Sequence, residues 1–187
     1  MLFRSKWRVL AVCGVMTAVV IAPSSAATSA VEKEVARSLS QLAALRPTSM
    51  AVIPDYRRDF FGTSWADVDG NGCRTRDDIL ARDLRTVRKR DACVVVSGVL
   101  ADPYTGVRES FTKAKASAIQ IDHVVPLSLA WRSGASSWPP GKLATIANDP
   151  LNLLAVDGAT NEAKSDSGPS EWLPPSARYQ CTYVMRF

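Results

Sequence analysis

The sequence predicts an α+β fold, supported by a disulfide bond, in which additional helices accompany a small antiparallel sheet. Three observations lead to this prediction. Apolar residues recur at helical spacing in residues 28–45, and runs rich in β-branched residues, typical of strands, occur at 93–100 and 119–125. Two cysteines, Cys73 and Cys93, stand on either side of a segment with helical periodicity.

The first 27 residues have the organisation of a signal peptide. Arg4, Lys6 and Arg8 form a positively charged start, residues 9–22 are apolar, and small residues at 23–27 suit a cleavage site. The alternative is a retained membrane anchor, although the apolar run is short for a span of about 20 residues. We expect a secreted, extracellular protein, exported from a bacterial cell and without stable membrane association after cleavage.

The charge of the chain lies partly in this leader. The full sequence carries 23 Lys and Arg against 18 Asp and Glu, a formal net charge of +5. Removing the leader removes three positive charges, which leaves 20 − 18 = +2. Net charge alone is therefore a weak indication of a nucleic-acid partner. The remaining roughly 160 residues suit one domain, and we expect a helix and linker at 28–55 followed by that domain at 56–187.

The cysteines predict one disulfide bond. Export places the protein in an oxidising compartment, where cysteines pair. We expect the Cys73–Cys93 pair, because it ties together the two ends of a predicted helical segment, and closing such a loop stabilises by about 3 kcal/mol. Cys181 is then left over.

A second helix is predicted over residues 76–90, where Ile79, Leu80, Leu84 and Val87 give an apolar face. The same segment contains several basic residues, which form either a phosphate-facing stripe or an ordinary solvated face. These residues are Arg82, Arg85, Arg88, Lys89 and Arg90.

The segment before this helix resembles the first half of a calcium-binding loop. Asp67, Asp69 and Asn71 supply oxygens at positions one, three and five, and Asp78 stands at position twelve. A structural calcium ion is one expectation. The alternative is a Gly-rich turn in which Thr75 caps the helix and Asp78 completes a capping box.

The second half of the chain predicts strand, long loop, strand-like segment and helix, in that order. A partner strand is expected at 107–111, a strand at 119–125, and a loop at 133–141. The strand-like segment is 151–156, and Thr160 is expected to cap the short helix that follows.

The only histidine, His123, follows Asp122 within the apolar run 119–125. One histidine excludes zinc sites built on two or three histidines, including the H-E-x-x-H protease site. A Ser-His-Asp hydrolase is disfavoured because no G-x-S-x-G elbow occurs. An imidazole beside a carboxylate indicates a general base with a metal ligand next to it.

Several motifs occur in an order that is specific to one protein family. This chain resembles the HNH endonucleases, in particular the group similar to the C-terminal domain of GmrSD-type restriction endonucleases. The motifs are D-H-V-V-P-L, N-D-P-L-N-L-L-A-V, N-x-x-K-x-D and W-L-P-P, preceded by F-G-x-x-W-x-D-V-D-G-N-G-C, T-R-x-D-I-L-x-R-D-L and D-P-Y-T-G. The resemblance covers roughly residues 56–186, and it implies a ββα-metal core of two strands and a helix.

The resemblance also implies a role for each residue of the site. His123 is the general base and Asp122 a metal ligand, Asn152 orients the His123 ring through its side chain, Asn161 is the second metal ligand, and Lys164 holds a substrate phosphate. Relatives often have His at the position of Asn161. Oxygen ligands favour Mg²⁺ or Mn²⁺. The implied substrate is DNA, with RNA as the alternative, bound largely without sequence specificity through its backbone.

Other interpretations fit the same residues. The chain could be a non-catalytic, calcium-stabilised binding module, or a phosphodiesterase that acts on small molecules. Members of the family usually continue past the Y-x-C-x-Y-V segment into a further helix, often with a last cysteine. This chain stops at Phe187, soon after Cys181, so we expect that such a C-terminal segment is missing. If that segment holds the partner of Cys181, its loss affects stability more than catalysis.

Overall fold

The computed structural model describes residues 25–44 and 56–187, which belong to two separate units, Met1–Pro47 and Thr48–Phe187. In the first unit, helix α1 spans Ser25–Ala44, which confirms the helix predicted over 28–45. Most of the predicted signal peptide lies outside the described residues. None of the described helices is long and apolar enough to cross a membrane.

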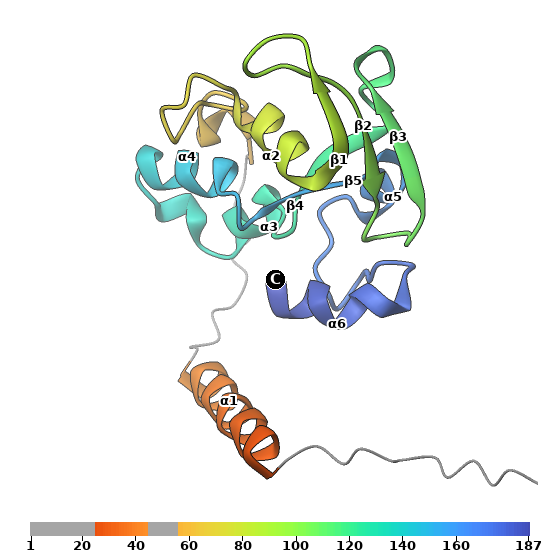
Figure 1. Ribbon diagram of the computed structural model, residues 1–187. Coiled ribbons are helices and arrows are strands. Elements are labelled where there is room, and N and C mark those ends of the chain that lie inside the picture. The colour runs from red at the N-terminus through yellow and green to blue at the C-terminus, as the bar shows by residue number, and fades with distance from the viewer. Residues whose placement is uncertain (1–24, 45–55) are drawn as a thin grey trace, which may run out of the picture. The chain divides into compact units, whose positions relative to one another are not determined.

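The second unit combines short helices with two antiparallel sheets, which confirms the predicted α+β class (Figure 1). Its elements, in chain order, are η1 (Arg58–Phe61), α2 (Thr75–Asp83), β1 (Leu84–Lys89), β2 (Val95–Ala101), β3 (Arg108–Thr112), η2 (Lys113–Lys115), β4 (Ile119–His123), α3 (Leu127–Arg132), η3 (Ala135–Ser137), α4 (Pro140–Asn148), β5 (Leu153–Asp157), α5 (Gly158–Lys164) and α6 (Ala177–Arg186).

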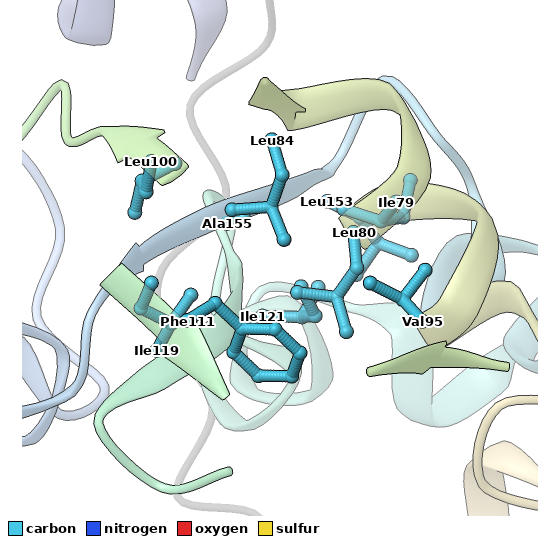
Figure 2. Close-up of a cluster of buried hydrophobic side chains, with 10 residues drawn as sticks. All are labelled: Ile79, Leu80, Leu84, Val95, Leu100, Phe111, Ile119, Ile121, Leu153 and Ala155. Carbon is cyan, nitrogen blue, oxygen red and sulfur yellow. The ribbon is translucent and has the colours of Figure 1, made fainter. Parts of the chain in front are cut away.

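The larger sheet has the order β1-β2-β3, and one of its faces builds the main core. Figure 2 shows Leu84, Leu100 and Phe111 from the three strands gathered with residues from α2, β4 and β5. These side chains are almost fully buried, and burying one such side chain stabilises by about 1.5–3 kcal/mol. The sheet is therefore apolar on the side that faces α2 and the smaller sheet.

The helix predicted over 76–90 is correct only as far as Asp83, because the chain continues as strand β1 from Leu84. Leu84 pairs with Leu100 of β2, and Thr86 takes a left-handed conformation (φ 49°) at a register shift between Arg85 and Arg88. The helical periodicity of the segment is compatible with this bulged strand, since the extra residue lets both Leu84 and Val87 pack on the core.

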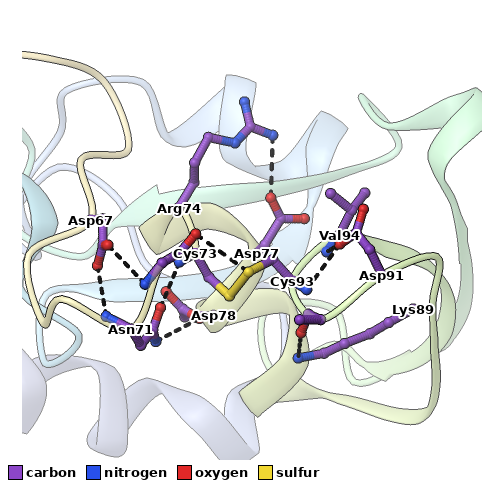
Figure 3. The surroundings of a disulfide bond; sticks show 12 residues. Asp67, Asn71, Cys73, Arg74, Asp77, Asp78, Lys89, Asp91, Cys93 and Val94 are labelled. Atoms are coloured by element: carbon purple, nitrogen blue, oxygen red, sulfur yellow. Dashed lines mark hydrogen bonds and ion pairs between the residues drawn. A yellow bond between two sulfur atoms is a disulfide. The ribbon is translucent and has the colours of Figure 1, made fainter.

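The predicted disulfide between Cys73 and Cys93 is present, with its Cα atoms 5.1 Å apart (Figure 3). It joins the Gly-rich loop before α2 to the turn between β1 and β2, instead of the two ends of one helix. Cys181 is a free, exposed thiol.

The loop that resembles a calcium site is a network of hydrogen bonds. Asp67 accepts the backbone N–H groups of Gly70, Asn71 and Gly72 at 2.9 to 3.1 Å. Asn71 donates from Nδ2 to Asp69. It also donates from Nδ2 to Asp78 (Figure 3). Asn71 thereby holds two of the predicted calcium ligands together, and calcium binding here stays a prediction.

The capping box, which was the alternative to a calcium loop, is absent from the described start of α2. The residue before the helix is Arg74, and its side chain makes no capping hydrogen bond. Thr75 is the first helical residue and donates its hydroxyl to the carbonyl of Ala66. Thr75 therefore ties the helix to the preceding loop.

The smaller sheet pairs β4 with β5, and α5 follows β5 directly, which gives the predicted arrangement of two antiparallel strands and a helix. Asp122 pairs with Leu154 and His123 with Leu153. The cap of α5 is Asp157, which accepts the backbone N–H of Thr160 at 2.7 Å, so the prediction of Thr160 as the cap is wrong.

The connection between β4 and β5 is more ordered than the predicted loop over 133–141. It contains α3, η3 and α4, and α4 begins at Pro140. Proline suits the first turn of a helix because no N–H is needed there. These helices pack with η1 around Phe61, Leu127 and Leu143, and so place η1 beside the end of β4.

Candidate active site

A cavity of about 440 Å³ opens where β4 ends beside α5 and η1. Asp122 and His123 from β4, Asn161 from α5 and Arg58 from η1 all line it. The structure thus brings three of the five predicted site residues to one cavity, and it adds an arginine that the sequence analysis did not select.

The His123 ring is held by a backbone carbonyl. Its Nε2 lies 2.9 Å from the carbonyl oxygen of Ala147, at the end of α4. Since that oxygen can only accept, Nε2 carries the proton in the neutral ring and Nδ1 keeps its lone pair. The Trp65 ring stacks on the imidazole, with centroids 6.0 Å apart and planes 22° from parallel. Both contacts fix the orientation that a general base needs.

Burial lowers the pKa of His123 to about 4, chiefly through desolvation of the charged ring. The Ala147 carbonyl opposes this change, and the positive charges of Arg58 and Lys164 reinforce it. The imidazole is therefore neutral near pH 7, the protonation state in which it can accept a proton.

Asp122 is buried and its carboxylate is held from two sides. Its Oδ1 accepts from Nζ of Lys164 at 2.9 Å, and its Oδ2 accepts from the Tyr104 hydroxyl at 2.5 Å. Burial and the Asp122 charge both raise the pKa of Tyr104, so this phenol stays protonated as a donor. Tyr104, at the turn after β2, is a site residue that the sequence analysis missed.

The expectation that Lys164 contacts a phosphate does not agree with its position in this structure. The side chain is 0% exposed, and Nζ donates to Asp122 Oδ1 and to the His123 carbonyl, each at 2.9 Å. Burial lowers the pKa of Lys164, while Asp122 raises it. Lys164 is here an internal counter-ion of Asp122, and it also fixes the backbone at His123.

Asn152 does not orient the His123 ring in this structure. Its Oδ1 accepts the backbone N–H of Val125 at 2.8 Å, and its Nδ2 donates to the Val125 carbonyl at 3.2 Å. The Asn152 carbonyl accepts the N–H of Val124. The amide therefore fastens the chain that leaves β4, and the Ala147 carbonyl takes the role expected of Asn152.

Asn161 projects from α5 toward β4, where its Nδ2 donates to Oε1 of Gln120 at 2.8 Å. Gln120 in turn donates to Glu162 at 2.9 Å, so its side chain is fixed. This bond turns the amide nitrogen of Asn161 toward Gln120 and leaves the amide oxygen as the group that can bind a cation.

Arg58 has the properties of a phosphate contact. It is exposed, lines the cavity, and makes no ion pair within residues 25–44 and 56–187, whereas its neighbour Arg57 is paired with Asp59. The sequence alone hardly distinguishes Arg58 from Arg57, because the two are adjacent and only the structure shows that Asp59 binds Arg57.

The donors at the cavity suit a hard divalent cation that is held by few protein ligands. Asp122 retains lone pairs beside its bonds to Lys164 and Tyr104, and Asn161 offers an amide oxygen. No group of three or more His, Cys, Asp or Glu able to hold a metal occurs in the described parts of the chain. This donor set fits Mg²⁺, which commonly keeps waters and binds through one or two carboxylates plus substrate phosphate.

Comparisons with known proteins agree with the order of motifs in the sequence. Residues 74–187 match the family model of GmrSD restriction endonucleases, C-terminal domain. A protein of Arthroderma benhamiae (strain ATCC MYA-4681 / CBS 112371), named "Uncharacterized secreted protein", is 44% identical over 130 residues, which is 68% of this chain. The match spans 61% of that relative, whose name agrees with the predicted export. No solved structure matches.

Proposed function

Since this chain belongs to the family of GmrSD restriction endonuclease C-terminal domains, we propose that it is a secreted, metal-dependent HNH endonuclease that hydrolyses phosphodiester bonds of DNA. The observation that supports this proposal most strongly is the neutral His123 ring, oriented by Ala147 and lining a cavity that also contains Asp122 and Asn161.

His123 acts as the general base in this proposal. Its Nδ1 accepts a proton from a water that attacks the phosphorus atom, and the Ala147 carbonyl stabilises the imidazolium that forms. Trp65 keeps the ring from rotating. A fixed ring matters because a displaced base loses much of its rate advantage.

Asp122 and Asn161 hold the metal, and Lys164 and Tyr104 hold Asp122. When bound, the divalent cation supplies positive charge to the phosphate and to the departing oxygen. Lys164 and Tyr104 are positioning residues, since they fix both carboxylate oxygens without reaching the cavity.

Arg58 is proposed as the substrate contact in place of Lys164. A guanidinium can bind two phosphate oxygens at once, and it stays charged at every relevant pH. The exposed position of Arg58 at the cavity allows this contact without breaking an existing ion pair.

The test is nicking of supercoiled plasmid by the purified protein with Mg²⁺ or Mn²⁺, compared with EDTA. We expect metal-dependent nicking that His123→Ala abolishes and that the distant control Arg178→Gln retains. Full activity of folded His123→Ala would reject the assigned base. Cleavage of bis-p-nitrophenyl phosphate without nicking would instead indicate a small-molecule phosphodiesterase, and no cleavage of either by folded protein would indicate a binding module.

A further inference from the structure

The face of the β1-β2-β3 sheet that points away from the core is basic. Leu84, Leu100 and Phe111 face the core, and side chains alternate between the two faces of a strand. The residues on the opposite face follow from the register. They are Arg85 and Arg88 on β1, Ser97, Val99 and Ala101 on β2, and Arg108, Ser110 and Thr112 on β3.

The bulge in β1 is what places two arginines on this face. Arg88 lies three positions after Arg85, a spacing that would put the two side chains on opposite faces of a regular strand. The register shift and the left-handed Thr86 restore the alternation, so that Arg85 lies opposite Val99 and Arg88 opposite Ser97. Bulges commonly re-aim a side chain in this way.

The three arginines of this face are exposed and make no ion pair with any residue that the structure describes. In contrast, other arginines have partners within the protein. Ion pairs with aspartates are made by Arg57, Arg74, Arg90 and Arg132. Backbone carbonyls accept hydrogen bonds from Arg82 and Arg186. None of the register-paired outward positions of this fully described sheet carries a carboxylate. The face therefore concentrates positive charge without an internal counter-ion.

We propose that this outward face, defined by Arg85, Arg88 and Arg108 with the hydroxyls of Ser97, Ser110 and Thr112, binds the phosphate backbone of the nucleic-acid substrate. Arginine and hydroxyl side chains are the groups that contact phosphate oxygens. The face extends over two inter-strand spacings, about 10 Å. This proposal rests on the proposed nuclease function, which supplies the polyanionic partner that the charge requires.

The experiment is a salt titration of binding to a fluorescein-labelled DNA duplex of 30 base pairs, measured by anisotropy in EDTA so that no cleavage occurs. Each phosphate contact contributes about 0.9 to the slope of log K against log salt for duplex DNA. We expect the triple variant Arg85→Gln/Arg88→Gln/Arg108→Gln to lower the magnitude of the slope by about 2.7, which is 3 × 0.9.

A matched variant, Lys33→Gln/Lys142→Gln/Arg178→Gln, removes the same charge from α1, α4 and α6, and it should leave the slope close to that of the unaltered protein. Thermal unfolding of both variants identifies any loss of fold. An unchanged slope in the folded sheet variant, or an equal loss in the matched variant, overturns the proposal. Loss of binding to phosphatidylglycerol vesicles with unchanged DNA binding also overturns it, in favour of a membrane surface.

These outcomes separate the two proposals. If the protein nicks plasmid but the sheet variant binds DNA with an unchanged slope, only the surface assignment fails. If the protein neither nicks plasmid nor binds the duplex, the proposed function fails, and the surface assignment fails with it.

Discussion

Nζ of Lys164 lies 2.9 Å from Oδ1 of Asp122, and both side chains are buried. These residues come from α5 and β4, so their ion pair fastens the helix to the strand that carries His123. Removing one partner of a buried ion pair leaves an uncompensated charge in a low-dielectric environment, which destabilises a protein far more than loss of a surface pair does.

Lys164→Met is expected to lower the free energy of unfolding by about 3–5 kcal/mol, because the Asp122 carboxylate then stays buried without its counter-ion. Urea unfolding followed by circular dichroism measures the change. Lys113→Met, at an exposed lysine of η2, is the matched control and should change stability by less than about 0.5 kcal/mol. Equal stability of the two variants would show that Lys164 is not an internal counter-ion.

The imidazole of His123 can be titrated without interference, because the chain contains one histidine. We expect its NMR resonances, recorded in EDTA, to titrate with a pKa of about 4, well below the ordinary value near 6.5. A midpoint near 6.5 would mean that the ring is hydrated and not packed between Trp65 and the Ala147 carbonyl.

The same pKa shift predicts how stability depends on pH. Between pH 4 and 6.5 the unfolded chain binds a proton at His123 that the folded protein does not, so the folded state loses stability as pH falls through this window. Above about pH 6.5 the His123 ring is neutral in both the folded and the unfolded state, so no stability is lost there through this group. His123→Gln should reduce this part of the pH dependence, measured as the urea midpoint at pH 7 and pH 5.

Patterns local in the sequence predicted much of the fold and part of the site. The β-branched runs gave β2 and β4, and Asp122 and His123 do line the cavity together with Asn161. The Cys73–Cys93 pair was also predicted correctly, although the elements that it joins differ from those expected. The two strands and the Asp122-His123 pair depend on residues that are close in the chain. The disulfide depends on cysteine, a residue type that usually forms disulfides in exported proteins.

The features that could not be predicted depend on contacts between distant segments. The end of α2 is set by pairing of β1 with β2, which favours a strand over a helical continuation. The burial of Lys164 depends on its bond to Asp122, 42 residues away in the chain, and Asp122 is itself held by Tyr104, 18 residues before it. The partner of the His123 ring is the backbone carbonyl of Ala147. Every residue has a backbone carbonyl, so the residue type at this position does not predict the contact.

Gly158, the first residue of α5, lies against the backbone of the segment before β4. A Cβ built at this position would stand 2.2 Å from the Ser117 carbonyl oxygen, whereas one at Gly141 of α4 would meet nothing within 4 Å. Gly158→Ala is expected to lower the free energy of unfolding by about 1–3 kcal/mol because the backbone must shift. Gly141→Ala is the control, and a similar cost for both variants in urea unfolding would contradict the close approach at Gly158.

The disulfide is expected to stabilise the second unit chiefly by restricting the unfolded chain. Cys73 and Cys93 are separated by 20 residues, and closing a loop of this length contributes about 3 kcal/mol. Cys73→Ser/Cys93→Ser should therefore unfold at lower temperature than the unaltered protein, measured by calorimetry without reductant. Cys181→Ser, at the free and exposed thiol, is the control and should unfold at the same temperature as the unaltered protein. If the double variant kept that temperature as well, the loop before α2 would already be fixed by Asp67 and Asn71, whose hydrogen bonds do not need the disulfide.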